Sequence, residues 1–303
     1  MFYPTNIATL LANDNLFFVG IDGGATNCRA SIFNAEGTLL ASGRSGSANP
    51  VNGVEKTLDS ILQAVNSAIE HLQRADIGLA NLVVGAGLAG LALPAMQQAL
   101  AKWQHPFYAL YITTDTYVAT LGAHEGEDGA IIILGTGFSA LAIVKGKEHP
   151  VGGHGFPIGA TCSGSWFGLE AVKAVLLDID KLGPATSLTK ELLCDSSLME
   201  LVERMNNALA PEFARYAPAV FKHAQDGDNV AQSLIAEGAK FIDQVITRLL
   251  SFGVSRIAFV GSIAPHIVPH LKQSYQPHIV RVKASPEQGA MMFARSRFIA
   301  TKK

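Results

Sequence analysis

Apolar and polar positions along the first part of the chain predict three strands followed by alternating helices and strands. Residues 17–21 form an apolar run, residues 28–33 alternate, and residues 38–42 follow the turn at 34–37, which is typical of consecutive hairpin strands. Residues 54–72 carry apolar side chains at three- and four-residue steps and predict an amphipathic helix. Two further strands (82–85 and 108–113), a helix at 93–103 and a helix starting near Asp115 complete the order βββαβαβα.

The same order begins again after residue 129 and predicts a duplicated α/β chain. The expected strands are residues 130–134, 139–144, a short segment after 145–147, 257–260 and 279–282, and helices fill most of 163–252, follow 261–262 and start at Pro286. Two α/β domains, residues 1–117 and 118–303, with a cleft between them are expected. The second domain carries a helical insert at about 178–228, and residues 1–15 are expected to be an extension or a short leading helix.

Composition narrows the class of protein. Of the 303 residues, 49 % are apolar and 16 % charged, and the net charge of −2 does not indicate a basic face for nucleic acid. The three cysteines, Cys28, Cys162 and Cys194, have no metal-binding spacing, and residues 1–15 lack the features of a secretory signal. No apolar run approaches the roughly 20 residues of a membrane span. We therefore expect a cytoplasmic protein with neither a nucleic-acid nor a membrane partner.

A glycine-rich turn follows the first predicted strand. Asp22 is followed by Gly23, Gly24, Ala25 and Thr26. Glycine lets the backbone approach a phosphate, the threonine hydroxyl can donate to it, and an aspartate at a strand end can hold Mg²⁺ through water. The alternative is an ordinary hairpin with a Gly-Gly turn. Neither a Walker loop nor a Rossmann turn fits, because no Gly-Lys-Ser/Thr follows and a strand, not a helix, comes next.

A second small-residue turn, Gly135-Thr136-Gly137, occupies the equivalent place in the second half. Two such turns facing each other across a cleft can grip a polyphosphate, and their repetition in register favours function over a plain hairpin. Between them, Asp115 follows a strand at the start of a helix. Aspartate at that place is more often a helix N-cap, and the functional alternative is a general base at the carboxyl edge of a sheet.

Two weaker signals lie in the second half. Residues 152–159 contain four glycines around His154, which predicts either a loop that approaches a substrate or a mobile connector. Gly261 and Ser262 end a strand before a helix, which suits a nucleotide base or ribose and equally an ordinary βα turn.

The motifs follow one another in the order Gly20 to Thr26, Ser47 to Pro50, Asp115, Gly135 to Gly137, the 152–159 loop, Gly261-Ser262 and Pro286 to Ala290. In this order they resemble the motifs of the BadF/BadG-type ATPases. Within that group, the chain is most similar to the N-acetylglucosamine and glucosamine kinases, of the superfamily of actin, sugar kinases and heat-shock ATPases. The resemblance covers about residues 17–300.

The resemblance implies a duplicated ribonuclease-H-like (actin-like ATPase) fold that uses ATP and Mg²⁺ to phosphorylate a sugar. Asp115 would take the proton from the sugar 6-hydroxyl, and the final helix, 286–300, would pack back on the N-terminal domain. ATP would contact Asp22, Gly23, Gly24, Thr26, Gly135, Thr136, Gly137, Gly261 and Ser262, with Mg²⁺ near Asp22. The sugar would contact Asn49, Ser139, Gly153, His154 and Gly155. Resembling proteins are commonly dimers, so a homodimer is expected.

The chain departs from the family on the sugar side. Ala160 and Thr161 replace two acids that members commonly carry, and His154 replaces a tryptophan of some members. Without a carboxylate at 160, N-acetylglucosamine is the first expected substrate and glucosamine the second. Two other classes stay open: an ATPase that activates a radical dehydratase through an iron–sulfur cluster, and a non-catalytic sugar sensor.

Overall fold

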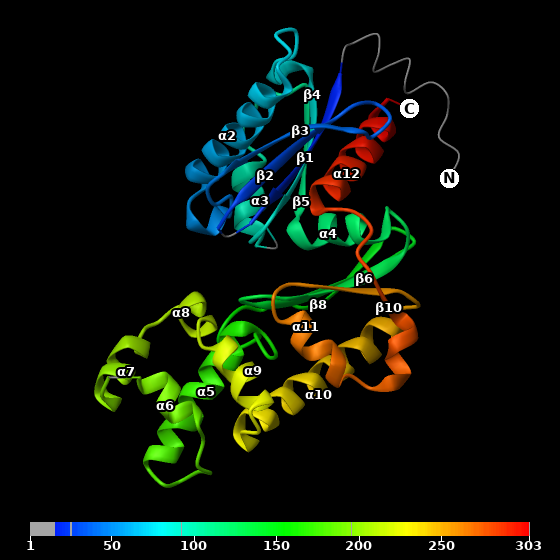
Figure 1. The fold of residues 1–303 in the computed structure, drawn as a ribbon. Helices are drawn as coiled ribbons and strands as arrows, with labels where there is room; N and C mark the ends of the chain where they lie inside the picture. The colour runs from blue at the N-terminus through cyan, green and yellow to red at the C-terminus, as the bar shows by residue number, and fades with distance from the viewer. Residues whose placement is uncertain (1–15, 25, 92, 195, 303) are drawn as a thin grey trace. The chain divides into compact units, whose positions relative to one another are not determined.

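The computed structural model describes residues 16–302 except 25, 92 and 195, and it divides into two compact units (Figure 1). One unit runs up to Glu127 and takes up the chain again at Val282, and the other is Asp128–Arg281. The expectation for residues 1–15 lies outside the described residues. Each unit is built around a mixed five-stranded sheet.

The first unit has the strand order β3-β2-β1-β4-β5. Its first three strands are antiparallel neighbours, and β4 and β5 run parallel to β1. The elements are β1 (Phe17–Gly23), β2 (Cys28–Phe33), β3 (Leu39–Ser45), η1 (Pro50–Asn52), α2 (Val54–Leu72), η2 (Leu79–Asn81), β4 (Leu82–Leu88), α3 (Pro94–Leu100), β5 (Ala109–Thr114), α4 (Asp115–His124) and α12 (Pro286–Thr301).

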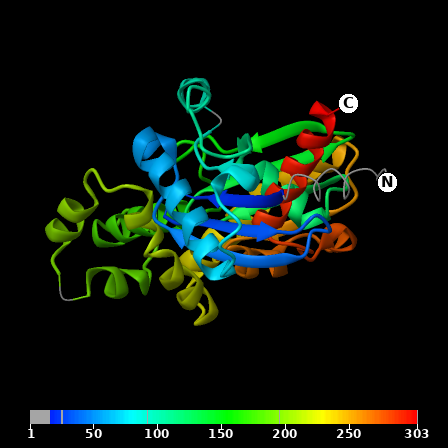
Figure 2. The same ribbon diagram turned by 90° about the horizontal axis from the view of Figure 1, so that it is seen from above.

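Alternate side chains of β1 pack against two different helices, α2 and α12. Val19 and Ile21 pack in one apolar cluster with Ile61 of α2, whereas Phe18 packs with Phe298 of α12 in another. Figure 1 shows α12 beside β1, and Figure 2 shows α2 beside the blue strands of the same unit. Because side chains of a strand alternate between faces, Phe18, Gly20 and Asp22 all face α12. The helix sits close because Gly20 has no Cβ; one built there would lie 1.7 Å from the backbone oxygen of Glu287.

The second unit has the strand order β10-β9-β6-β7-β8, the same mixed arrangement as the first. Its apolar core joins the sheet to the long helices α5 and α10. The elements are β6 (Gly129–Leu134), β7 (Phe138–Val144), β8 (Lys147–Gly152), α5 (Gly164–Ile179), α6 (Leu188–Leu193), α7 (Leu198–Met205), α8 (Ala210–Ala214), α9 (Ala217–Gln225), α10 (Asn229–Ser251), β9 (Ile257–Val260), α11 (Ala264–Ile267), η3 (Val268–His270), η4 (Gln273–His278) and β10 (Ile279–Val280).

The observed division differs from the boundary at 117/118. The first unit keeps the whole of α4 and also contains α12, because these helices pack against each other at glycines. A Cβ on Gly122 would lie 2.3 Å from the backbone oxygen of Ser285, and one on Gly289 would lie 2.0 Å from that of Val118. Such close backbone contact makes α4 and α12 one packed layer of the first unit. Among the described residues, no helix is both long and apolar enough to span a membrane.

Candidate functional site

Asp22 is the next-to-last residue of β1 and is half-buried, directly opposite the exposed Arg29 of β2. Burial raises the pKa of its carboxyl from 3.8 to about 6; repulsion from Glu287 and then from Asp115 adds to this, and Arg29 lowers it. The carboxyl groups of Asp22, Asp115 and Glu287 therefore interact within one unit, although they come from three different elements. Asp22 and Asp115 are predicted site residues, whereas the sequence motifs give no role to Glu287.

The Gly23-Gly24 turn is required first of all by the fold. A Cβ on Gly23 would lie 2.4 Å from Leu88 Cδ2, so a larger residue there would force the buried Leu88 side chain to shift. The Gly24 N–H donates to the carbonyl oxygen of Asn27 at 2.8 Å, which closes the turn and occupies that donor. Thr26 is exposed, and its hydroxyl has no hydrogen bond to another described residue. The Thr26 hydroxyl is therefore available as a donor to a phosphate.

Asp115 is the first residue of α4, at the point where β5 ends. Thr114, not Asp115, is the N-cap, because its hydroxyl accepts the Tyr117 N–H. Asp115 Oδ1 accepts the backbone N–H (2.8 Å) and the hydroxyl (3.2 Å) of Thr116. Burial raises the pKa of the carboxyl, and the hydrogen bonds from Thr116 oppose this. The carboxyl is thus held in one orientation by a single oxygen.

Asn49 lies in the same unit as the N-cap of η1. Its Oδ1 accepts the Val51 N–H at 3.0 Å, so the side chain is fixed by its own turn. Gly90 packs against it: a Cβ there would lie 2.4 Å from Asn49 Oδ1. The amide NH₂ group has no hydrogen bond to a described residue and is available as a donor.

In the second unit, Gly135, Thr136 and Gly137 form the turn between β6 and β7. A Cβ on Gly135 or Gly137 would meet nothing within 4 Å, so open space borders this turn. The Gly135 N–H donates to the Gly137 carbonyl, whereas the N–H groups of Thr136 and Gly137 have no hydrogen bond within the described chain. Two backbone donors next to open space form an anion cradle.

A pocket of about 540 Å³ opens beside this turn, within the range of small-molecule sites. Gly135, Thr136 and Ser262, which are predicted nucleotide contacts, line it. Gly261, at φ +100°, is held for another reason: a Cβ there would lie 2.1 Å from the Leu134 carbonyl oxygen. Gly261 therefore lets the chain pass close to the end of β6 and presents Ser262 to the pocket.

The remaining lining of the pocket comes from helices α8, α9 and α11, and no sequence motif predicts it. Its lining side chains include Arg215, Lys222, Gln225 and His266. The His266 ring stacks on the Phe221 ring, with centroids 4.2 Å apart and planes 12° apart. These residues belong to the predicted insert or follow it, and their neighbourhood depends on how the helices pack rather than on local spacing.

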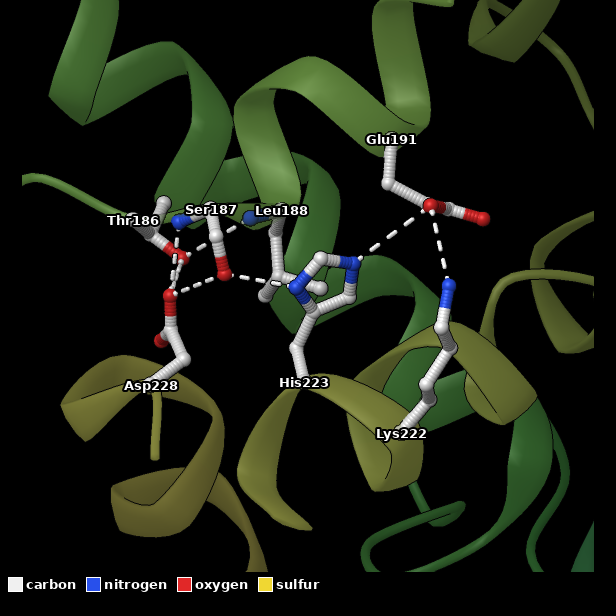
Figure 3. Close-up of polar contacts among 7 residues, drawn as sticks. All are labelled: Thr186, Ser187, Leu188, Glu191, Lys222, His223 and Asp228. Atoms are coloured by element: carbon white, nitrogen blue, oxygen red, sulfur yellow. Dashed lines mark hydrogen bonds and ion pairs between the residues drawn. The ribbon is translucent and has the colours of Figure 1, made fainter. Parts of the chain in front are cut away.

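A network of polar side chains connects the segment before α6 with helices α9 and α10 (Figure 3). Asp228, the N-cap of α10, accepts the Ser187 N–H (2.6 Å), the Ser187 hydroxyl (2.8 Å) and the Thr186 hydroxyl (2.8 Å). Burial raises the pKa of Asp228, but these hydrogen bonds and one from Ala231 outweigh it and lower the pKa to about 2. The network therefore ties the segment before α6 to the start of α10.

The neighbouring Glu191 reaches the helix that lines the pocket. Its Oε2 lies 3.5 Å from His223 Nε2 and 3.7 Å from Lys222 Nζ (Figure 3). His223 Nδ1 lies 2.6 Å from Ser187 Oγ, so α9 is joined to the Asp228 network as well. These contacts orient α9 and its pocket residue Lys222.

The predicted sugar loop lies in the second unit but outside the 540 Å³ pocket. Ser139 pairs with Gly152 across β7 and β8, and a Cβ on Gly153 would lie 3.6 Å from Ser139 Cβ. Gly155 and Gly159 form a bridge in which the Gly159 N–H donates to the Gly155 carbonyl at 2.7 Å. The loop is thus closed on itself, with His154 exposed.

The donor set near Asp22 fits a hydrated Mg²⁺. Carboxylates are the ligands Mg²⁺ prefers, and it usually takes one or two of them and keeps several waters. Among the described residues, no group of three histidine, cysteine or acidic side chains is placed to enclose a metal. Asp22 would therefore hold the ion with water and ligand oxygens in its other positions, and the ion would offset the repulsion between the buried carboxylates.

Comparison with known proteins agrees with this architecture. The chain is 36 % identical over 280 residues to glucosamine kinase GspK of Vibrio cholerae, covering 92 % of this chain and 95 % of the relative. It is 26 % identical over 312 residues to N-acetyl-D-glucosamine kinase of Dictyostelium discoideum, covering 91 % and 97 %. A solved structure from Chromobacterium violaceum, assigned as a candidate N-acetylglucosamine kinase, superposes with a TM-score of 0.84 at 25 % identity and covers 92 % and 99 %.

More distant structures share the fold. A ROK-family glucokinase from Streptomyces griseus superposes with a TM-score of 0.57 at 18 % identity over 92 % of this chain and 99 % of the other. Each half of the chain is thus one copy of the duplicated ribonuclease-H-like fold, as the resemblance implies. The profile of the BadF/BadG/BcrA/BcrD ATPase family matches residues 19–294, and the chain belongs to this family.

Proposed function

We propose that this chain transfers the terminal phosphoryl group of MgATP to the 6-hydroxyl of an amino sugar. The relatives named as amino-sugar kinases, which cover more than nine-tenths of the chain, support this class of reaction. The observation that carries the proposal is Asp115, a carboxyl group oriented at the end of β5 with a raised pKa. Phosphoryl transfer to an alcohol needs such a group to orient the acceptor hydroxyl and take its proton.

The hydrogen bonds from Thr116 determine which oxygen of Asp115 is available to a substrate. Both hydrogen bonds from Thr116 end on Oδ1, so Oδ2 is left for the acceptor hydroxyl. Burial favours the protonated carboxyl and so makes the carboxylate a stronger base than an exposed aspartate. Asn49, whose amide NH₂ group is available, is proposed to donate to another sugar hydroxyl.

The second unit is proposed to bind the nucleotide. The Thr136 and Gly137 N–H groups would donate to phosphate oxygens, and the adenosine would occupy the pocket lined by Ser262 and His266. Mg²⁺ near Asp22 would supply positive charge to the phosphates. The protein's own part is to position these groups and to hold the acceptor carboxylate in one orientation.

Glucosamine is proposed as the first substrate and N-acetylglucosamine as the second, which reverses the order expected from the sequence. That order depended on the missing carboxylate at position 160. In the structure Ala160 is 1 % exposed, so its side chain faces the protein interior and says little about a sugar amine. The greater identity to a glucosamine kinase supports the new order.

The dehydratase-activator alternative receives little support from the cysteines. Cys28 and Cys162 are buried, and burial raises the pKa of the Cys28 thiol to about 12. A cluster shared between subunits needs thiolates at a surface, and of the three cysteines Cys194 alone is exposed.

The test is ADP release in a coupled assay with glucosamine, N-acetylglucosamine, glucose and no sugar, with the product site located by NMR. We expect turnover with amino sugars, kcat/KM highest for glucosamine, and little ADP release without sugar. A higher kcat/KM for N-acetylglucosamine would restore the sequence-based order. ATP hydrolysis indifferent to every sugar would reject the kinase proposal.

A further inference from the structure

Glu287 is a buried acidic residue whose side chain has no partner among the described residues. It lies in the first turn of α12, after the N-cap Ser285 and Pro286, and is 8 % exposed. No hydrogen bond or ion pair to its side chain occurs in the described part of the chain. A carboxylate removed from water is unfavourable unless a cation or a hydrogen-bond donor compensates for the lost hydration.

Glu287 is held next to Asp22 by the close packing of α12 on β1. The missing Cβ of Gly20 lets the Glu287 backbone rest on β1, two residues before Asp22. Gly20 and Asp22 point to the same face of the strand, so Asp22 faces the first turn of α12. Glu287 repels the Asp22 carboxylate more strongly than Asp115 does, and its field also reaches Cys28.

Two nearby sources of positive potential, the N-terminal end of α12 and Arg29, do not offset the charge of both carboxylates. The N-terminal end of α12 favours negative charge, but it acts on the first turn and not on Asp22 in the strand. Arg29 lies opposite Asp22 on β2, yet it is exposed, and its effect on Asp22 is smaller than those of burial, Glu287 and Asp115. Arg29 therefore offsets only part of the unfavourable effects on the Asp22 carboxylate, and a bound cation would offset the rest.

We infer that Glu287 and Asp22 together hold a hard divalent cation, with water and, in the complex, phosphate oxygens in its remaining positions. Two carboxylates with a hydrated ion match the preference of Mg²⁺, which seldom takes an all-protein cage. The inference rests on the proposed function for the purpose of the ion, since the ion would serve MgATP. It also makes α12 a support of the metal site and gives the Pro286-Glu287 helix start a role beyond capping.

The experiment measures binding of Mn²⁺ alone to the nucleotide-free full chain, from the electron paramagnetic resonance signal of the free ion. Glu287→Gln removes the charge at nearly constant shape, Glu287→Asp keeps the charge on a shorter side chain, and Glu70→Gln removes an exposed charge elsewhere in the unit. We expect one site in the wild type, a 10- to 100-fold weaker affinity in Glu287→Gln, partial recovery in Glu287→Asp and no change in Glu70→Gln. Circular dichroism establishes that each variant is folded.

The inference and the proposed function fail separately. If the wild type binds no Mn²⁺, or if folded Glu287→Gln binds it as tightly as the wild type, the inference is overturned even when sugar phosphorylation proceeds. If Mn²⁺ affinity depends on Glu287 but no sugar is phosphorylated, the metal site stands and the kinase proposal falls. In a working kinase, Glu287→Gln is expected to raise the Mg²⁺ concentration needed for half-maximal rate.

Discussion

Asp22→Asn is expected to stabilise the nucleotide-free and metal-free protein, and more so at higher pH. Burial, with repulsion from Glu287 and Asp115, raises the pKa of Asp22 from 3.8 to about 6. Between these values the folded chain holds a proton that the unfolded chain has lost, so wild-type stability falls as the pH rises through this window. The charge cost is complete above about pH 6, and asparagine removes it.

The magnitude follows from the two pKa values. The gain in unfolding free energy for Asp22→Asn is about 1 kcal/mol at pH 4.5 and at most about 3 kcal/mol at pH 8. Loss of sugar phosphorylation is expected in the same variant, because the proposed metal ligand is gone. A substitution that raises stability while it abolishes turnover is the usual sign of a functional group held at an energetic cost.

The assay is urea unfolding in EDTA, followed by tryptophan fluorescence at pH 4.5 and pH 8. The two tryptophans, Trp103 and Trp166, lie in different units, so a Trp166→Phe background makes Trp103 report on the unit that contains Asp22. Asp59→Asn, an exposed aspartate of α2, is the matched control. If Asp22→Asn changes stability by the same amount at both pH values, or lowers it at both, the buried charge does not carry the cost assigned to it.

Three further predictions concern the other proposed site residues. Asp115→Asn keeps the side-chain shape and is expected to lower kcat by about 10²- to 10⁴-fold with little change in the KM for ATP; an unchanged kcat would exclude it as the base. Gly135→Ala is expected to fold normally but to raise the KM for ATP, because its Cβ would enter the open space beside the turn. Gly261→Ala is expected to lower the free energy of unfolding by about 1–3 kcal/mol, because its Cβ would meet the Leu134 carbonyl oxygen. Equal thermal stability of the two variants would contradict this. His266→Ala removes an exposed ring stacked on Phe221 and is expected to weaken ATP binding in calorimetry without changing the KM for the sugar.

The order of elements is predictable because it depends on short-range periodicity. The predicted helix at 54–72 coincides with α2, since its apolar face repeats at helical spacing, and β2 coincides with the alternating run 28–33. The predicted helix at 93–103 is shorter in the structure, Pro94–Leu100, with turn residues after it. The compact units divide after Glu127 rather than at the predicted 117/118, because the glycine contacts between α4 and α12, which no local pattern reveals, join α4 to the first unit.

The candidate site residues likewise fall into those that a local sequence pattern marks and those that long-range packing positions. Asp22, Gly135 and Asp115 stand at strand ends, where a sequence pattern can mark them, and their roles stay predictions until tested. Glu287 in the first unit, and Lys222 and His266 at the pocket of the second unit, belong to helices that are positioned by long-range packing within their own unit. The signal for Glu287 is an acid directly after a helix-starting proline, which capping alone explains equally well.

Metal binding should offset the loss of stability caused by the charged Asp22 carboxylate. The last prediction therefore links protein stability to the proposed metal site. Mg²⁺ at about 100 times its dissociation constant stabilises a folded protein by about 2.7 kcal/mol, close to the cost assigned to charged Asp22 at pH 8. Added Mg²⁺ should therefore nearly close the gap between wild type and Asp22→Asn at pH 8. At pH 4.5 it should do little, because a proton occupies the Asp22 carboxyl group at that pH. Urea unfolding with Mg²⁺ or with EDTA measures both effects. Equal stabilisation of wild type and Asp22→Asn by Mg²⁺ would place the ion elsewhere and separate the buried charge from the chemistry.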